Sequence, residues 1–165
     1  MKKHIINLAK KPFVPESWIL ESHIKGDKAW EFDASKIELW LSKKQKTSYQ
    51  VGAELQKEVP NPFNANLLDY LLEHKELIPE DWKGKWVFFH GTVYRGSGGG
   101  LCVRCLVWNG DGWNWNFYWL VNGFLSGSPA AVMIESNPKT LSASPSLDFS
   151  PSEILKLKKF AESLK

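Results

Sequence analysis

Three runs of sequence decide the fold of this chain: Trp86-Val-Phe-Phe-His-Gly-Thr-Val-Tyr-Arg95, Leu101-Cys-Val-Arg-Cys-Leu-Val-Trp108 and Trp113-Asn-Trp-Asn-Phe-Tyr-Trp-Leu120. Each run is rich in β-branched and aromatic residues, which favour strands. The breaks between them, Gly96-Ser-Gly-Gly-Gly100 and Asn109-Gly-Asp-Gly112, are typical of hairpin turns. The pattern therefore predicts three consecutive antiparallel strands.

The lengths of the two turns predict which side chains share a face of this sheet. A symmetric turn places Trp108 opposite Trp113, and the glycine-rich turn pairs Arg95 with Leu101. One face then carries a bulky, aromatic set: Phe88, His90, Thr92, Tyr94, Cys102, Arg104, Leu106, Trp108, Trp113, Trp115, Phe117 and Trp119. The other face carries Val87, Phe89, Val93, Leu101, Val103, Cys105, Val107, Asn114, Asn116 and Tyr118. One of the faces must cover a core, because a lone sheet in water needs a buried side.

Helices are predicted on the N-terminal side of this sheet. The segment from Asn64 to Leu77 combines an N-capping Asn with an apolar stripe of leucines, and it is expected to cover the aromatic sheet. Residues 51–59 predict a short helix that Pro60 ends. Residues 33–46 fit a strand by alternation and a helix by their capping residues, and the helix is favoured.

Short strands are expected at either end of this region. Residues 4–8 and 18–24 are β-prone, and residues 129–134 predict a fourth strand of the sheet. Because proline is tolerated at the start of an edge strand, Pro129 places that strand at a sheet edge. The fold class is therefore α+β: an antiparallel β-meander of three to five strands, covered by helices on one face.

Residues 1–135 are expected to form a single compact α+β domain. Residues 136–149 are rich in Ser and Pro and predict a linker. Residues 150–165 predict a tethered, amphipathic C-terminal helix that starts at a capping box, Ser150-Pro-Ser-Glu153. This helix could dock on its own sheet or on a partner.

Composition narrows the class of protein. The chain has 165 residues, nine Trp, two Cys and a formal net charge of +3. That charge alone does not indicate nucleic-acid binding, and two cysteines predict no disulfide framework. No run is apolar enough to predict a membrane span, and the N-terminus lacks a secretory pattern, so a cytoplasmic location is expected.

Several motifs together resemble one family. They are Asn64-Ala-Asn-Leu-Leu-Asp-Tyr-Leu-Leu72, Leu77-Ile-Pro-Glu-Asp-Trp-Lys83, Phe89-His-Gly-Thr-Val-Tyr-Arg95, Val103-Arg104, Trp119-Leu120 and Pro129-Ala-Ala-Val132. Across residues 4–133 the chain resembles a family of small, Trp-rich hypothetical proteins from bacterial genomes. The resemblance implies one compact unit up to about the fourth strand, and it carries over no catalytic residues.

Three features could carry chemistry, and each has a simpler interpretation. Cys102 and Cys105 have the spacing of a zinc or redox pair, but residues three apart in a strand point to opposite faces, so ordinary buried cysteines are expected. The glycine-rich loop lacks the residues of a phosphate-binding loop. His90 has Arg104 nearby but no recognisable nucleophile motif. No catalytic residue, metal site or cofactor is therefore predicted.

The aromatic face remains as the candidate binding surface. Part of it is expected to be core, but nine Trp exceed what such a core requires, so some should be exposed and mark an interface. We predict a small, non-catalytic binding module whose most favoured ligand is a protein partner; its oligomeric state stays open. The candidate ligand-binding residues are His90, Tyr94, Arg104, Trp108, Trp113, Trp115 and Trp119. The alternatives are a nucleic-acid-binding protein, an enzyme with a His90/Tyr94/Arg104 cleft, and a carbohydrate-binding module.

Overall fold

The structure is a computed structural model that describes residues 3–134. The predicted linker at 136–149 and the predicted helix at 150–165 lie outside the described residues. Residues up to Met133 form one compact unit. Its strands are β1 (Ile5–Ile6), β2 (Ile19–His23), β3 (Trp30–Glu31), β4 (Ile37–Trp40), β5 (Gln50–Val51), β6 (Val87–Phe88), β7 (Thr92–Arg95), β8 (Leu101–Trp108), β9 (Trp113–Trp119), β10 (Gly123–Phe124) and β11 (Ala130–Met133). Its helices are α1 (Lys43–Thr47), α2 (Gly52–Glu58) and α3 (Ala65–Glu73), with short 3-10 turns at Ala34–Lys36, Lys75–Leu77 and Glu80–Trp82.

The main sheet is built around β8. Strand β9 pairs along one edge of β8, while β7 and β6 follow one another along its other edge. Strand β2 extends the sheet beyond β7, and β11 followed by β4 extends it beyond β6. Strands β6 and β11 are parallel and the other pairs are antiparallel. The prediction of an α+β fold with a mostly antiparallel sheet is confirmed, but within residues 3–134 the sheet has seven strands rather than three to five.

Both hairpins have the predicted register. Trp108 lies opposite Trp113 across the second turn, and Arg95 lies opposite Leu101 across the first. Gly99 and Gly110 have φ angles of 96° and 97°, a backbone conformation that residues with a side chain rarely adopt. The glycines of these two turns therefore set the pairing of the central strands.

The first predicted strand is interrupted. Phe88 pairs with Cys105 and Tyr94 pairs with Cys102, so six positions along the first run match only three along β8. The three additional residues form a turn in which the Phe89 carbonyl accepts a hydrogen bond from the Thr92 N–H, 3.4 Å. Because the number of additional residues is odd, the side chains before the turn lie on the opposite face of the sheet from the one that an uninterrupted strand would give them.

This interruption corrects part of the predicted face assignment. Phe88 and His90 lie on the face opposite the Trp ladder, whereas Val87 and Phe89 pack on the ladder side. Tyr94, which follows the interruption, lies on the predicted face with Arg104. The change of face is confined to the first run, because the pairing of β8 with β9 has the predicted alternation throughout.

Helix α3 covers the face of the sheet that carries Trp113, as predicted. Its apolar stripe, which includes Leu67, Leu68 and Leu71, packs with Leu106 and Trp113 in one buried cluster. Complete burial of each such leucine contributes roughly 2 kcal/mol. Asn64 caps the helix, because its side chain accepts the N–H of Asn66.

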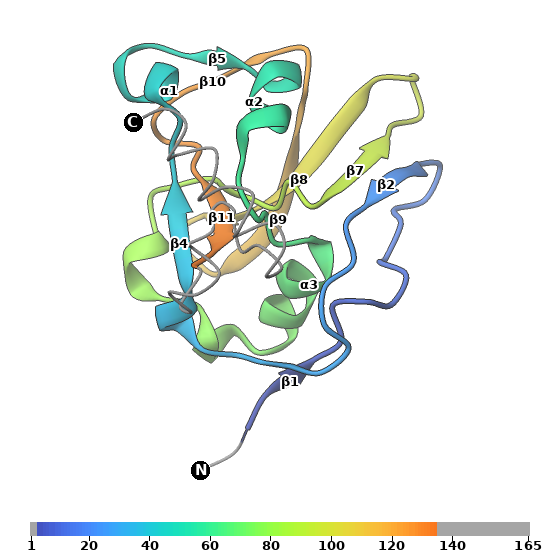
Figure 1. Ribbon diagram of the computed structural model, residues 1–165, viewed down its shortest axis with the longest axis vertical. Coiled ribbons are helices and arrows are strands. Elements are labelled where there is room, and N and C mark those ends of the chain that lie inside the picture. Colours follow the sequence, from blue (N-terminus) through green and yellow to red (C-terminus); the bar gives the residue numbers. More distant parts are fainter. Residues whose placement is uncertain (1–2, 135–165) are drawn as a thin grey trace, which may run out of the picture. The chain divides into compact units, whose positions relative to one another are not determined.

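The opposite face is covered as well, which corrects the expectation of helices on one face only. Leu55 of α2 and Phe124 of β10 pack on Phe88, Val103 and Cys105 in a second buried cluster. Figure 1 shows α2 with β5 and β10 near the top of the view, α3 below, and β8 and β9 between them. This double coverage explains why β8 is apolar on both sides.

Two predicted elements differ from the structure. The favoured helix at 33–46 is wrong: a 3-10 turn capped by Asp33 leads into β4, and the helix α1 starts only after Ser42. Strand β4 pairs with β11. The local pattern of this segment fits both a strand and a helix, and the pairing with β11 determines that it forms a strand. The strand predicted at 129–134 exists as β11, but it lies between β6 and β4 and not at an edge.

Candidate functional site

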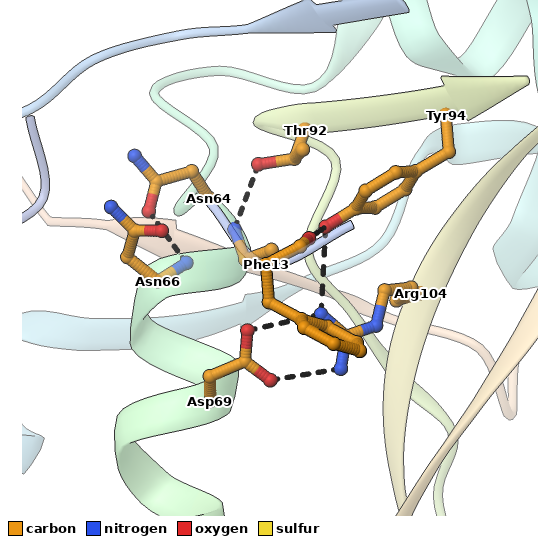
Figure 2. Close-up of polar contacts among 8 residues, drawn as sticks. Phe13, Asn64, Asn66, Asp69, Thr92, Tyr94 and Arg104 are labelled. Atoms are coloured by element: carbon orange, nitrogen blue, oxygen red, sulfur yellow. Dashed lines mark hydrogen bonds and ion pairs between the residues drawn. The ribbon is translucent and has the colours of Figure 1, made fainter. Parts of the chain in front are cut away.

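The side chain of Arg104 lies buried between β8 and α3. Its guanidinium forms two bonds with the carboxylate of Asp69, Nη2–Oδ1 at 2.8 Å and Nη1–Oδ2 at 3.1 Å. The ring of Trp115 lies 4.2 Å from the guanidinium carbon and the ring of Phe13 lies 5.2 Å from it. Figure 2 shows Arg104 pointing toward Asp69, with the Phe13 ring over it. With only 1% of its surface exposed, Arg104 is enclosed by its partners.

Tyr94 completes this cluster. Its hydroxyl donates to the Phe13 carbonyl at 2.8 Å, and Arg104 Nη1 lies 3.5 Å from the same oxygen. Burial raises the pKa of Tyr94, so the phenol stays protonated. Burial on its own would lower the pKa of Arg104, but the bonds with Asp69 more than offset it and the pKa is raised. The guanidinium therefore stays charged, and its two Nη groups are directed at Asp69 and Tyr94, while its buried Nε has no hydrogen-bond partner among the described residues.

His90 lies away from this cluster. It is fully buried between Phe88 and Phe124, and its Nδ1 lies 2.7 Å from the Oε1 of Gln56. Burial lowers the pKa of His90 from 6.5 to about 3, so the ring is neutral. Because the amide oxygen of Gln56 can only accept a hydrogen bond, the proton of this bond lies on Nδ1. His90, Tyr94 and Arg104 thus do not line one cleft, because the interruption of the first strand turns His90 to the other face.

The two cysteines diverge, as the strand geometry predicts. Cys102 packs with Tyr94 on one face of β8, and Cys105 packs with Phe88 and Val103 on the other. Burial raises the pKa of Cys102 to about 11 and also raises the pKa of Cys105. Both thiols are free and stay protonated at neutral pH.

The four Trp residues of the ladder have different environments. Trp113 is 5% exposed beneath α3 and belongs to the core. Trp108 contacts Trp113 edge to face, with the Lys83 ammonium 3.9 Å from the centroid of the Trp108 ring. Trp115 packs on Arg104, and Trp119 lies at the far end of β9. Trp108, Trp115 and Trp119 are half-buried, so the ladder is partly core and partly surface.

An apolar pocket lies beside Trp119, and we name it the Trp119 pocket. Its volume is about 550 Å³, within the range of ligand pockets in proteins. Three parts of the chain line it: the start of α2, the glycine-rich turn, and the end of β9. The lining residues are Val51, Ala53, Gly98, Gly100, Leu101, Trp119, Leu120 and Val121. Every one is apolar or glycine, and Val121 at the rim is 79% exposed.

The glycine-rich turn has a steric role in this pocket. A Cβ atom added to Gly96 would lie 2.8 Å from Cη2 of Trp119, and one added to Gly100 would lie 3.2 Å from Cε3 of the same ring. The ring of Trp119 therefore packs directly on the backbone of the turn. Glycine allows this approach and keeps the indole oriented as one wall of the pocket.

A second, smaller hollow lies beside Tyr118 of β9. Its volume is about 300 Å³, and Trp86, Tyr118 and Leu125 are among its lining residues. Trp86 is 40% exposed, and its ring contacts that of Tyr118 edge to face.

Of the predicted candidates, only Trp119 lines the larger pocket. The other walls come from residues 51–53, 98–101 and 120–121, and Val121 follows the strand as one apolar residue in a turn. No local pattern marks residues 51–53 as neighbours of Trp119. The repeated glycines before Leu101 were the one available signal, since they indicate a close approach of some other group.

Comparison with protein-family models, with curated proteins and with solved structures gives no match to this chain. The resemblance to small Trp-rich proteins stays a prediction. Among residues 3–134, no helix has the length and apolar character needed to cross a membrane. Within the same range, no group of three or more His, Cys, Asp and Glu side chains is placed to hold a metal ion.

Proposed function

We propose that this chain is a small, non-catalytic binding module whose Trp119 pocket accepts an apolar side chain of a protein partner. The observation that carries the proposal is the lining of this pocket, which is apolar throughout and has the exposed Val121 at its rim. A surface of this kind is where an aliphatic or aromatic anchor of a partner gains most from leaving water.

The placement of reactive groups supports binding over catalysis. In the described part of the chain, the imidazole of His90 and both thiols are buried, and each is held in its neutral form. Arg104 is occupied by Asp69, and Tyr94 donates to the backbone. A general base must reach the proton it removes, and none of these groups opens onto the Trp119 pocket.

The chemistry of the lining also favours a protein over nucleic acid. Phosphate contacts need Lys or Arg side chains or exposed backbone N–H groups, and a base platform needs a positively charged path for the backbone. No lining residue of the Trp119 pocket carries a charge. Together with two unpaired cysteines, which suit a reducing compartment, this supports a cytoplasmic protein–protein function.

A photoreactive cross-linker placed at Val121 tests the proposal in cells. We expect a discrete cross-linked product with one protein, and no such product when the cross-linker replaces Ile19, an apolar residue on β2 that is also exposed. The captured protein is then purified and must bind the wild-type chain directly. Equal cross-linking from both positions, or a product with nucleic acid at Val121, would contradict the proposal.

A further inference from the structure

Within the residues that the structure describes, strand β9 is an open edge of the main sheet. It pairs with β8 along its whole length, and no other strand within residues 3–134 pairs with it. From Trp113 to Trp119 the strand carries no charged residue, no proline and no register shift. An edge of this kind is a template for the addition of another strand.

The positions of the hydrogen bonds between β8 and β9 show which peptide groups of β9 are free to bond to another strand. Leu120 donates to the Leu101 carbonyl, and Asn109 donates to the Gly112 carbonyl, which sets the bonded pairs of this hairpin. Bonded and non-bonded pairs alternate in an antiparallel ladder, so the odd-numbered residues of β9 direct their N–H and C=O groups away from β8. Trp115 and Phe117 are the central two of these residues.

The other two edges of the sheet are protected. Strand β2 has an exposed Glu21 and a register shift between Leu20 and Ser22, and strand β4 has only four residues, including an exposed Glu38. Charge, irregularity and shortness are the usual means of preventing edge-to-edge association. Strand β9 has none of the three.

We propose that β9 pairs in antiparallel fashion with β9 of a second copy of this chain. The strand is complementary to itself in two respects: in the direction of its peptide groups and in the kind of side chain on each face. When the outward peptide groups of two copies meet, aromatic residues lie opposite aromatic residues on one face, and asparagine lies opposite asparagine or tyrosine on the other. A shift by one position would lose both matches at once.

One register uses the two central outward residues fully. Asn116 lies opposite Asn116 of the second copy, and Trp115 lies opposite Phe117, so the two pairs exchange four backbone hydrogen bonds. The aromatic rings then form cross-strand pairs of a favourable type. The absence of charge on the strand avoids the repulsion that self-pairing otherwise creates.

Asn116 also limits the strength of this association. Its Oδ1 accepts the N–H of Phe117 at 2.8 Å in the single chain. Self-pairing must replace that bond with one to the second copy, so the dimer forms in competition with an internal cap. The pairing is therefore reversible, and in this register Trp119, which is one wall of the Trp119 pocket, lies opposite Trp113 of the second copy.

Sedimentation equilibrium of the full chain and two cysteine variants test the pairing. Asn116 lies opposite itself with the two Cα atoms about 4.5 Å apart, within the span of a disulfide. We expect Asn116→Cys to form a covalent dimer under mild oxidation. Asn114→Cys, on the same strand and face, lies opposite Tyr118 and should stay largely monomeric. The native cysteines are buried and do not interfere.

A charge variant provides the second readout. Asn116→Ala and Asn116→Lys both remove the internal bond to the Phe117 N–H, but only Asn116→Lys places two ammonium groups opposite one another, so it should dimerise roughly tenfold more weakly than Asn116→Ala. Ser22→Lys, at an exposed position of the edge strand β2, should leave the dimer unchanged. A chain that stays monomeric up to about 1 mM, a dimer that Asn116→Lys weakens no more than Asn116→Ala does, or equal cross-linking at positions 114 and 116 would each overturn the proposal.

Discussion

The guanidinium of Arg104 and the carboxylate of Asp69 form two parallel hydrogen bonds that join the central strand β8 to the helix α3. Arg104 is 1% exposed, and the side chain of Asp69 is 29% exposed. A charge that is buried on a sheet face requires a partner of opposite sign, and α3 supplies it from the solvent side. This ion pair therefore fixes where the helix lies on the aromatic face.

Removal of Asp69 should destabilise the fold. In Asp69→Ala the charge of Arg104 remains buried without a counter-ion, and we expect a loss of about 2–4 kcal/mol, somewhat less than for a fully buried pair because water reaches Asp69. Urea unfolding of the full chain measures the loss. The double variant Asp69→Leu with Arg104→Met should recover most of it, and a double variant as unstable as Asp69→Ala would contradict this interpretation.

His90 should make the fold sensitive to acid. Its pKa is about 3 in the folded chain and near 6.5 when unfolded, so the unfolded state binds the proton first as the pH falls. The free energy of unfolding should therefore decrease below pH 6.5, by on the order of 1.4 kcal/mol per pH unit, until about pH 3. The measurement is denaturant unfolding across this range.

The variant His90→Gln is the control for this pH dependence. Its amide can bond to Gln56 without titrating, so the slope between pH 6 and 4 should become smaller. His23, whose pKa is also lowered by burial, leaves a residual slope of the same sign. An unchanged slope in His90→Gln would show that other groups account for the acid sensitivity.

The predictable part of the fold is the part set by local turn chemistry. Glycines in left-handed conformation, such as Gly99 and Gly110, determine the hairpin registers, and these follow from sequence. The interruption at Phe89–Gly91 does not, because the run stays β-prone throughout. Its reason is non-local: Gly91 donates to the Phe63 carbonyl just before α3. The same limit applies to the Trp119 pocket, whose walls meet only in the folded chain.

Substitution of Gly91 tests this non-local requirement. A Cβ atom there would lie 2.8 Å from the Phe63 carbonyl oxygen and 2.9 Å from Cα of Asn64, and backbone atoms cannot move aside easily. Gly91→Ala should therefore destabilise the chain by roughly 1–3 kcal/mol. Gly112→Ala, where a Cβ atom meets nothing within 4 Å, is the matched control in thermal unfolding. Equal effects of the two variants would contradict the close approach.

A second glycine pair tests the orientation of Trp119. Gly96→Ala brings a methyl group against the indole and should displace it, with a measurable shift of Trp fluorescence and a loss of roughly 1–2 kcal/mol. Gly98→Ala adds a methyl group in open space and should change neither quantity. If both variants match the wild type, the turn does not support the ring.

The central claim is that the Trp119 pocket is the surface that binds the protein partner. The most direct test uses the partner that cross-linking identifies, purified in its free form, and compares its affinity for the wild-type chain with its affinity for a variant that has a charge at the rim of the pocket. Val121 is 79% exposed, so Val121→Glu should leave thermal stability unchanged. We expect this variant to bind at least roughly tenfold more weakly than the wild type, because a carboxylate must lose water at an apolar surface. The matched variant Ile19→Glu should bind normally. Wild-type affinity of Val121→Glu, measured by calorimetry, would contradict the account.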